Sequence, residues 1–134
     1  MAEAPLLRLT DVTKRFKGAR RGAPPVQALS GISLKLAAGR SLGLVGPDAG
    51  GKTTLMRVLA GLVEADSGAV EVLGAPVAQL DRALIGYMPQ GGALYAELSV
   101  EQNLNLYARL RGLEPDDNPA RIDLLYRATG LAPF

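Results

Sequence analysis

Hydrophobic and polar residues alternate along two segments in the first third of the chain. Residues 7–12 and 32–36 both show this pattern, which predicts two half-buried strands. The run 40–45, Arg-Ser-Leu-Gly-Leu-Val, is apolar enough to predict a buried strand of a parallel sheet. Two shorter apolar runs, 69–73 and 84–88, predict further strands. We therefore expect a mixed β-sheet.

Helical spacing of apolar residues follows in three segments. Leu55, Val58, Leu59 and Leu62 predict a helix that ends near Gly61. The second helix begins after a capping box, Ser99 with Gln102, and ends at about Arg111; the third begins at Asn118-Pro119 and ends at Gly130. The expected buried positions of these two helices are Val100, Leu104, Tyr107 and Ala108, and then Ile122, Leu125 and Ala128. Strands followed by helices, with no internal repeat or long linker, predict one α/β domain.

Composition narrows the possible functions only slightly. The 134 residues carry a net charge of +2 and contain no cysteine, which excludes disulfides, thiolate metal sites and a cysteine nucleophile. Neither a signal peptide nor a membrane-spanning segment is visible, so we expect any link to a membrane to go through a partner. A basic cluster at 14–21 could suggest nucleic acid, but its place beside the Gly/Pro-rich run 18–25 favours a solvated loop, and no nucleic acid partner is expected.

The strongest chemical signal is the segment 46–53, Gly-Pro-Asp-Ala-Gly-Gly-Lys-Thr, which matches the phosphate-binding P-loop pattern. The glycines let backbone N–H groups wrap a β-phosphate at the start of a helix. The Lys52 ammonium suits the β- and γ-phosphates, and the Thr53 hydroxyl suits Mg²⁺. A chance match is disfavoured by the expected strand before the loop and helix after it. The predicted phosphate-binding residues are Gly46, Pro47, Asp48, Ala49, Gly50, Gly51, Lys52, Thr53 and Thr54.

Several motifs in order resemble the ATP-binding subunit of ATP-binding-cassette (ABC) transporters. They are residues 9–16, 28–33, the phosphate loop, the turn Asp66-Ser-Gly68, and 85–90, so the resemblance covers nearly the whole chain. Residues 87–95 and 98–104 look most like the subgroup that serves multidrug-type exporters. The resemblance implies an α/β P-loop NTPase core that binds ATP and Mg²⁺.

The resemblance also implies roles for two residues outside the loop. Phe16 matches the aromatic residue that stacks on adenine, although a core residue at the end of a strand is the alternative. Gln90 matches a glutamine that reaches Mg²⁺ and the attacking water, although an ordinary turn residue is the alternative. Lys52 and Gln90 are thus the candidate catalytic residues, and Thr53 and Gln90 the candidate metal ligands.

The phosphate loop departs from the family pattern at two positions. The family usually has Gly where this chain has Ala49, and a small residue where this chain has Gly50. If residue 49 needs a positive φ, alanine costs roughly 1 kcal/mol there, and the strain either weakens binding or shifts to Gly50.

The hydrolytic parts of the family are absent from the sequence. There is no Leu-Ser-Gly-Gly signature, no apolar strand ending in Asp-Glu and no histidine, so we expect no hydrolysis by this chain alone. The hypothesis is an N-terminal part of a longer domain, with an ATP-binding core at 1–98, the start of a helical subdomain at 99–134, and truncation before the signature and the Walker B strand.

Within the whole protein, the resemblance implies ATP hydrolysis that drives export. Its partners would be a second nucleotide-binding domain, as a homodimer or tandem copy, and a membrane permease that holds it on the cytoplasmic face of the membrane. Three alternatives stay open: a soluble ABC-type ATPase acting on ribosomes or DNA, a P-loop switch or kinase, and an ATP-binding fragment that does not hydrolyse. A guanine-reading Asn-Lys-x-Asp motif is absent.

Overall fold

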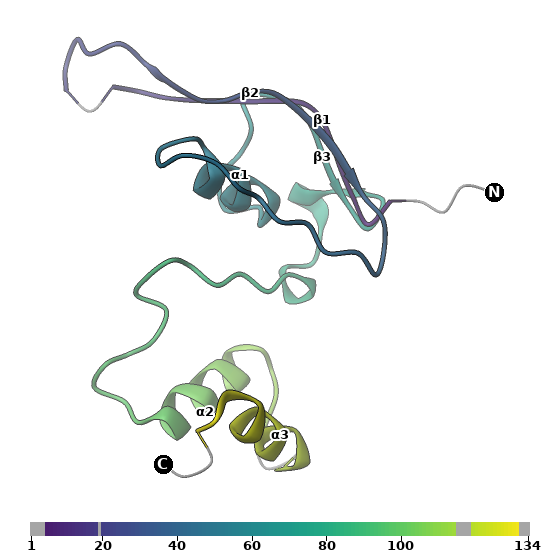
Figure 1. Ribbon diagram of the computed structural model, residues 1–134, viewed down its shortest axis with the longest axis vertical. Coiled ribbons are helices and arrows are strands. Elements are labelled where there is room, and N and C mark those ends of the chain that lie inside the picture. The colour runs from purple at the N-terminus through teal and green to yellow at the C-terminus, as the bar shows by residue number, and fades with distance from the viewer. Residues whose placement is uncertain (1–4, 19, 115–118, 132–134) are drawn as a thin grey trace. The chain divides into compact units, whose positions relative to one another are not determined.

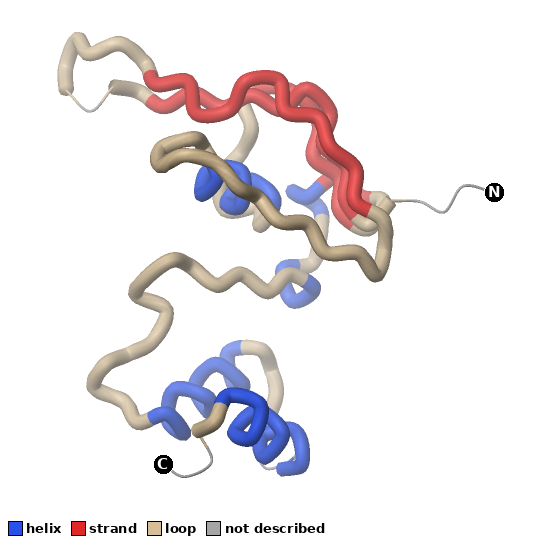
Figure 2. The backbone as a smooth tube through the Cα atoms, in the orientation of Figure 1, coloured by secondary structure: helices blue, strands red, loops and turns tan. Residues whose placement is uncertain are grey.

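The computed structural model describes residues 5–18, 20–114 and 119–131 and divides the chain into two compact units. The first unit comprises residues 1–87 and the second residues 88–134. Among the residues that the structure describes, the first unit contains the strands and helix α1, and the second contains helices α2 and α3 (Figures 1 and 2). Among the described residues, no helix is both long and apolar enough to span a bilayer.

The first unit is built on an antiparallel sheet with the strand order β2-β1-β3-β4. The three predicted strands at 7–12, 32–36 and 69–73 are confirmed, because each overlaps one of these strands. β1 runs further than predicted, to Phe16, since both of its edges are paired over most of its length. The bounds are β1 Leu7–Phe16, β2 Val26–Leu36, β3 Ser67–Val72 and β4 Ala75–Pro76.

Two predicted strands do not form. Residues 40–45 were expected to be buried, but they are irregular and exposed, and the Val45 side chain is 94% exposed. No described strand runs beside residues 40–45, so this apolar segment has no partner strand with which to form backbone hydrogen bonds. The prediction for 84–88 is also wrong: Leu84 ends the 3₁₀ helix η2 (Arg82–Leu84), which the Asp81 side chain caps at Ala83 N–H, and the residues after it are irregular.

The core of the first unit lies between the sheet and α1 (Lys52–Leu59). Leu55 and Val58, one helical turn apart, provide the buried face of α1. The predicted stop at Gly61 is confirmed: Gly61 has a φ of 67°, and the Leu62 N–H donates to the Arg57 carbonyl in a Schellman motif. The buried hydrophobic residues are Leu9, Val12, Leu29, Leu55, Val58 and Val70.

The second unit contains α2 (Val100–Leu110) and α3 (Pro119–Thr129). The predicted capping box is confirmed, with Ser99 N–H donating to the Gln102 side chain and Gln102 N–H to the Ser99 hydroxyl. The third helix was predicted to begin at Asn118-Pro119. It begins at Pro119, while Asn118 lies outside the described residues, and Gly130 follows the helix with a φ of 72°.

The predicted buried faces of both helices are largely wrong. On α2, Val100 and Tyr107 are exposed, and Leu104 and Ala108 are half-buried. On α3 the disagreement is larger. Ile122 is half-buried, but Leu125 is 41% exposed and Ala128 is exposed. Leu125 lines an apolar groove that it shares with residues of α2, including Leu104 and Tyr107, so the two helices enclose a groove and not a filled core.

Candidate functional site

The loop between residues 46 and 51 folds into a tight turn in front of α1. The Gly50 N–H donates to the Pro47 carbonyl over 3.2 Å, and Ala49 has a φ of 60°. Gly50 is outside the left-handed region. Residue 49 therefore does adopt a positive φ, the condition under which strain was expected there. The strain lies at Ala49 and is not shifted to Gly50.

Gly51 joins the loop to the sheet by a close backbone approach. Its φ is 83°, and a Cβ added there would lie 2.3 Å from the Ala28 carbonyl oxygen, so only glycine fits. Ala28 is the extra residue of a bulge in β2, because Lys14 pairs with Leu29 and the next residue of β1, Arg15, pairs with Gln27. The bulge therefore carries the backbone group against which the loop packs.

Lys52 lies across the loop that it follows. Its Nζ donates to the Gly46 carbonyl over 2.8 Å and to the Pro47 carbonyl over 2.6 Å. Gly46 and Pro47 are exposed residues, and a phosphate oxygen is a stronger acceptor for an ammonium than a neutral carbonyl. The side chain therefore already points over the loop where phosphates would be received.

The N-terminus of α1 is suited to an anion. Its N-cap is Gly51, which offers no side chain to the first N–H groups, and the first turn, Lys-Thr-Thr-Leu, contains no acidic residue. Free N–H groups and the positive end of the helix dipole favour a negative ligand. The hydroxyls of Thr53 and Thr54 lie in the same turn, which gives a donor set that fits a phosphate chain with Mg²⁺.

Phe16 ends β1 and is 40% exposed, which argues against its alternative as a core residue. Phe16 pairs with Val26 on β2. Val26 is two residues from Ala28, whose carbonyl lies against Gly51. Two strand residues span about 7 Å, so the Phe16 end of the hairpin lies next to the point where the phosphate loop meets the sheet.

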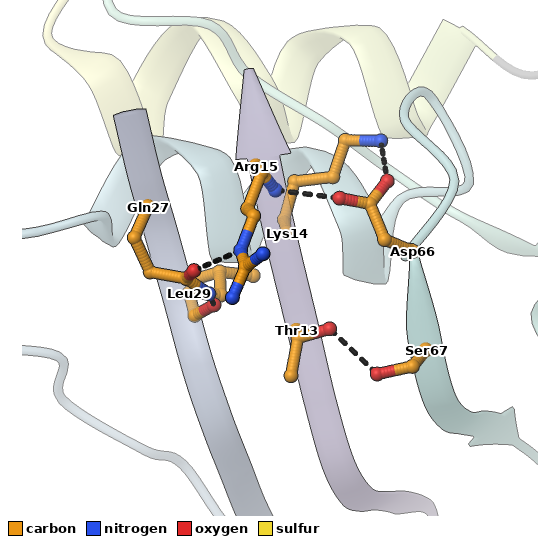
Figure 3. A network of polar contacts seen from close by, with 7 residues as sticks. All are labelled: Thr13, Lys14, Arg15, Gln27, Leu29, Asp66 and Ser67. Atoms are coloured by element: carbon orange, nitrogen blue, oxygen red, sulfur yellow. Dashed lines mark hydrogen bonds and ion pairs between the residues drawn. The ribbon is translucent and has the colours of Figure 1, made fainter. Parts of the chain in front are cut away.

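A polar network crosses the sheet just before Phe16 (Figure 3). The Asp66 carboxylate accepts from Lys14 Nζ over 2.7 Å and from the Arg15 N–H over 2.6 Å. The Lys14 hydrogen bond and then the Arg15 amide hold the pKa of Asp66 below its ordinary value of 3.8. Thr13 and Ser67 hydroxyls lie 2.6 Å apart, and Arg15 Nε donates to the Gln27 amide oxygen.

The interpretation of the whole basic cluster as a solvated loop is therefore wrong for Lys14 and Arg15. Both residues belong to β1, and the Lys14 side chain is only 15% exposed. Sequence reasoning missed them because Asp66 lies 52 positions from Lys14 in the chain, and no local pattern shows that β1 and β3 pair. The tertiary structure alone brings the two charges together.

Gln90 belongs to the second unit, where it is exposed in an irregular segment. The segment that follows it is fixed to α2 by Asn103, which is 6% exposed. Asn103 accepts from the Tyr95 N–H over 2.9 Å and donates to the carbonyls of Tyr95, Leu98 and Ser99. The Tyr107 hydroxyl donates to the Ala93 carbonyl. Sequence reasoning did not single out Asn103, because a lone amide in a helix has no distinctive spacing.

The glycine loop, the lysine lying over it and the uncapped helix behind it define a P-loop nucleotide-binding protein. A family model described as ABC transporter matches residues 29–133. The chain belongs to this family.

One relative is the probable multidrug ABC transporter ATP-binding protein YbhF of Escherichia coli (strain K12). It is 42% identical over 132 residues, which are 96% of this chain and 22% of the relative, so the chain spans about a fifth of that protein.

Two solved structures share the fold. The structure of the ATP binding subunit of an ABC transporter has a TM-score of 0.73 and 27% identity, covering 96% of this chain and 52% of that one. A dimeric structure of a post-hydrolysis state of the ATP-binding cassette MJ0796, bound to ADP and Pi, has a TM-score of 0.68 and 25% identity, covering 78% and 47%. These matches confirm the resemblance and the α/β P-loop fold class.

Proposed function

We propose that this chain binds MgATP as the ATP-binding component of an ABC transporter. The observation that carries the proposal is the position of Lys52, whose ammonium spans the carbonyls of Gly46 and Pro47 at the uncapped start of α1. On binding, Lys52 exchanges these carbonyls for phosphate oxygens, and the loop N–H groups turn toward the β-phosphate. Family membership and the relatives' ATP-binding names support ATP as the nucleotide.

The remaining site residues are assigned by the same proposal. The Thr53 hydroxyl would hold Mg²⁺, Thr54 would add a contact nearer the α-phosphate, and Phe16, which is partly exposed, would stack on adenine. Gln90 would contact Mg²⁺ and the attacking water, an assignment that rests on its match to the family motif. Mg²⁺ would neutralise phosphate charge, while Lys52 supplies the protein's own positive charge.

The action of the whole protein is part of the proposal. Residues 1–98 form the ATP-binding core and residues 99–134 begin a helical subdomain. A second nucleotide-binding domain faces the first, a pairing supported by the dimeric cassette, and a membrane permease holds both domains on the cytoplasmic face of the membrane. ATP hydrolysis drives export, a direction supported by the multidrug name of the relative.

The test is MgATP binding by titration calorimetry in the wild type and in Lys52→Ala. A charge-assisted hydrogen bond is worth about 1.5–3 kcal/mol, so the Kd should rise roughly tenfold or more. Lys17→Ala is the matched control, since it removes the same charge from an exposed residue outside the loop. Equal affinities of wild type and Lys52→Ala would refute the proposed site. Chelation of Mg²⁺ with EDTA should also weaken binding.

A further inference from the structure

Lys14 is a mostly buried, ion-paired lysine that is not part of the phosphate loop. Its ammonium is bonded to the Asp66 carboxylate and lies 5.7 Å from the centroid of the Phe16 ring. This distance is within the range of a cation–π contact. Lys14 and Phe16 are two residues apart in β1, so their side chains project from the same face of the strand.

Two contacts hold this ammonium, the ion pair with Asp66 and the contact with the Phe16 ring. Asp66 is anchored to the same strand by two further bonds, since its carboxylate accepts from the Arg15 N–H and its own N–H donates to the Thr13 carbonyl over 2.9 Å. Only a small fraction of the Lys14 side chain is exposed, so a normally mobile side chain has lost most of its freedom. A flexible surface lysine would not hold one position over a ring.

The Phe16 ring has a cation on it and is also partly open. The Lys14 ammonium lies over the ring, and Phe16 is 40% exposed, so part of the residue is accessible to solvent or a ligand. A flat aromatic base is the chemical class that suits such a site, because stacking needs a ring held in a fixed plane.

We propose that Lys14, held by Asp66, is a positioning residue that fixes the Phe16 ring as the platform for the nucleotide base. This inference rests on the proposed function, in which Phe16 stacks on adenine. Lys14 does not touch the nucleotide. It acts through the ring, so its contribution is confined to ligands that carry a base and is absent for a bare phosphate chain.

The experiment compares two probes, MgATP and magnesium tripolyphosphate, by titration calorimetry on the wild type and Lys14→Met. Methionine keeps the length of the side chain but removes the charge. A cation–π contact is worth about 0.5–1 kcal/mol at an exposed site. Because this contact already exists before the nucleotide binds, that energy sets the upper limit of its effect, and the Kd for MgATP should rise measurably, by up to about fivefold. The Kd for tripolyphosphate should not change. Lys14→Arg, which keeps both the ion pair and the cation over the ring, should restore the affinity for MgATP.

Lys17→Met is the matched control, because it removes the same charge one residue beyond Phe16 and should leave the ratio of the two Kd values unchanged. An unchanged ratio in Lys14→Met would overturn the inference. Equal losses for both probes would also overturn it, since they would show a general effect of the ion pair on the fold or on the field around the phosphates.

Phe16→Ala separates the inference from the proposed function. The preference for MgATP over tripolyphosphate is the ratio of the two Kd values. If this preference falls in Phe16→Ala but not in Lys14→Met, Phe16 still acts as the adenine platform and Lys14 has no role in it. No change in Phe16→Ala would overturn the platform itself, and the inference with it, while Lys52→Ala would still test the phosphate site.

Discussion

Ala49 is strained in the phosphate loop, and its replacement by glycine is the sharpest test of the loop geometry. The φ of 60° places an alanine Cβ in the left-handed region, where glycine is free of the steric clash. The neighbouring Gly50 is outside that region, so the strain is confined to one residue. We expect Ala49→Gly to stabilise the protein slightly and to leave the affinity for ATP unchanged or improved.

The magnitude follows from two opposing terms. Relief of the left-handed alanine contributes about 1–2 kcal/mol to the free energy of unfolding. The extra conformational freedom of glycine in the unfolded chain subtracts about 0.4–1 kcal/mol. The expected net gain is therefore about 0–1.5 kcal/mol.

The assay is denaturant unfolding together with MgATP titration calorimetry. Ala60→Gly is the matched control, because Ala60 has a φ of −80° and glycine relieves no strain there. This control should lose stability, whereas Ala49→Gly should not. A loss of stability in Ala49→Gly equal to that of the control would refute the strain at residue 49. A clear loss of ATP affinity would refute the conclusion that alanine at position 49 is not needed for binding.

Three further predictions concern the frame around the site. Leu73 has a φ of 53° in the two-residue turn between β3 and β4, followed by Gly74 at 79°, so Leu73→Asn should raise the free energy of unfolding by up to about 1 kcal/mol. Asn103→Asp should place a carboxylate against three carbonyls and increase hydrogen exchange across residues 93–99; unchanged exchange would contradict the anchoring role. The pKa of Asp66 is lower in the folded state than its ordinary value of 3.8, so the ionised carboxylate stabilises the fold above pH 3.8 and this contribution is lost as the pH falls through the lowered folded-state pKa. The difference in Tm between wild type and Asp66→Asn should therefore narrow below pH 3.8.

The phosphate loop could be predicted from the sequence because its chemistry is local. The glycines, lysine and threonine are adjacent in the chain, and the helix that follows begins at the loop, so spacing alone predicts the site. The helix ends were equally local, since Gly61 and the Ser99 capping box act within one turn.

The strand predictions show where the local signal stops. The segments 7–12, 32–36 and 69–73 formed strands because β1 lies between two partners. The segment 40–45 has an equally apolar sequence but stands beside no described strand. In 84–88, Leu84 ends a 3₁₀ helix and the residues after it are irregular. A strand is stabilised by a neighbour, which the residues of the strand itself do not specify.

The sequence by itself determined the phosphate loop, the helix caps and the family, because these depend on residues that are close in the chain or matched in order. Only the tertiary structure decided that Lys14 meets Asp66 and that the Ala28 bulge receives Gly51. The physical reason is strand pairing: it joins residues tens of positions apart, and its register depends on the whole sheet and not on any one segment.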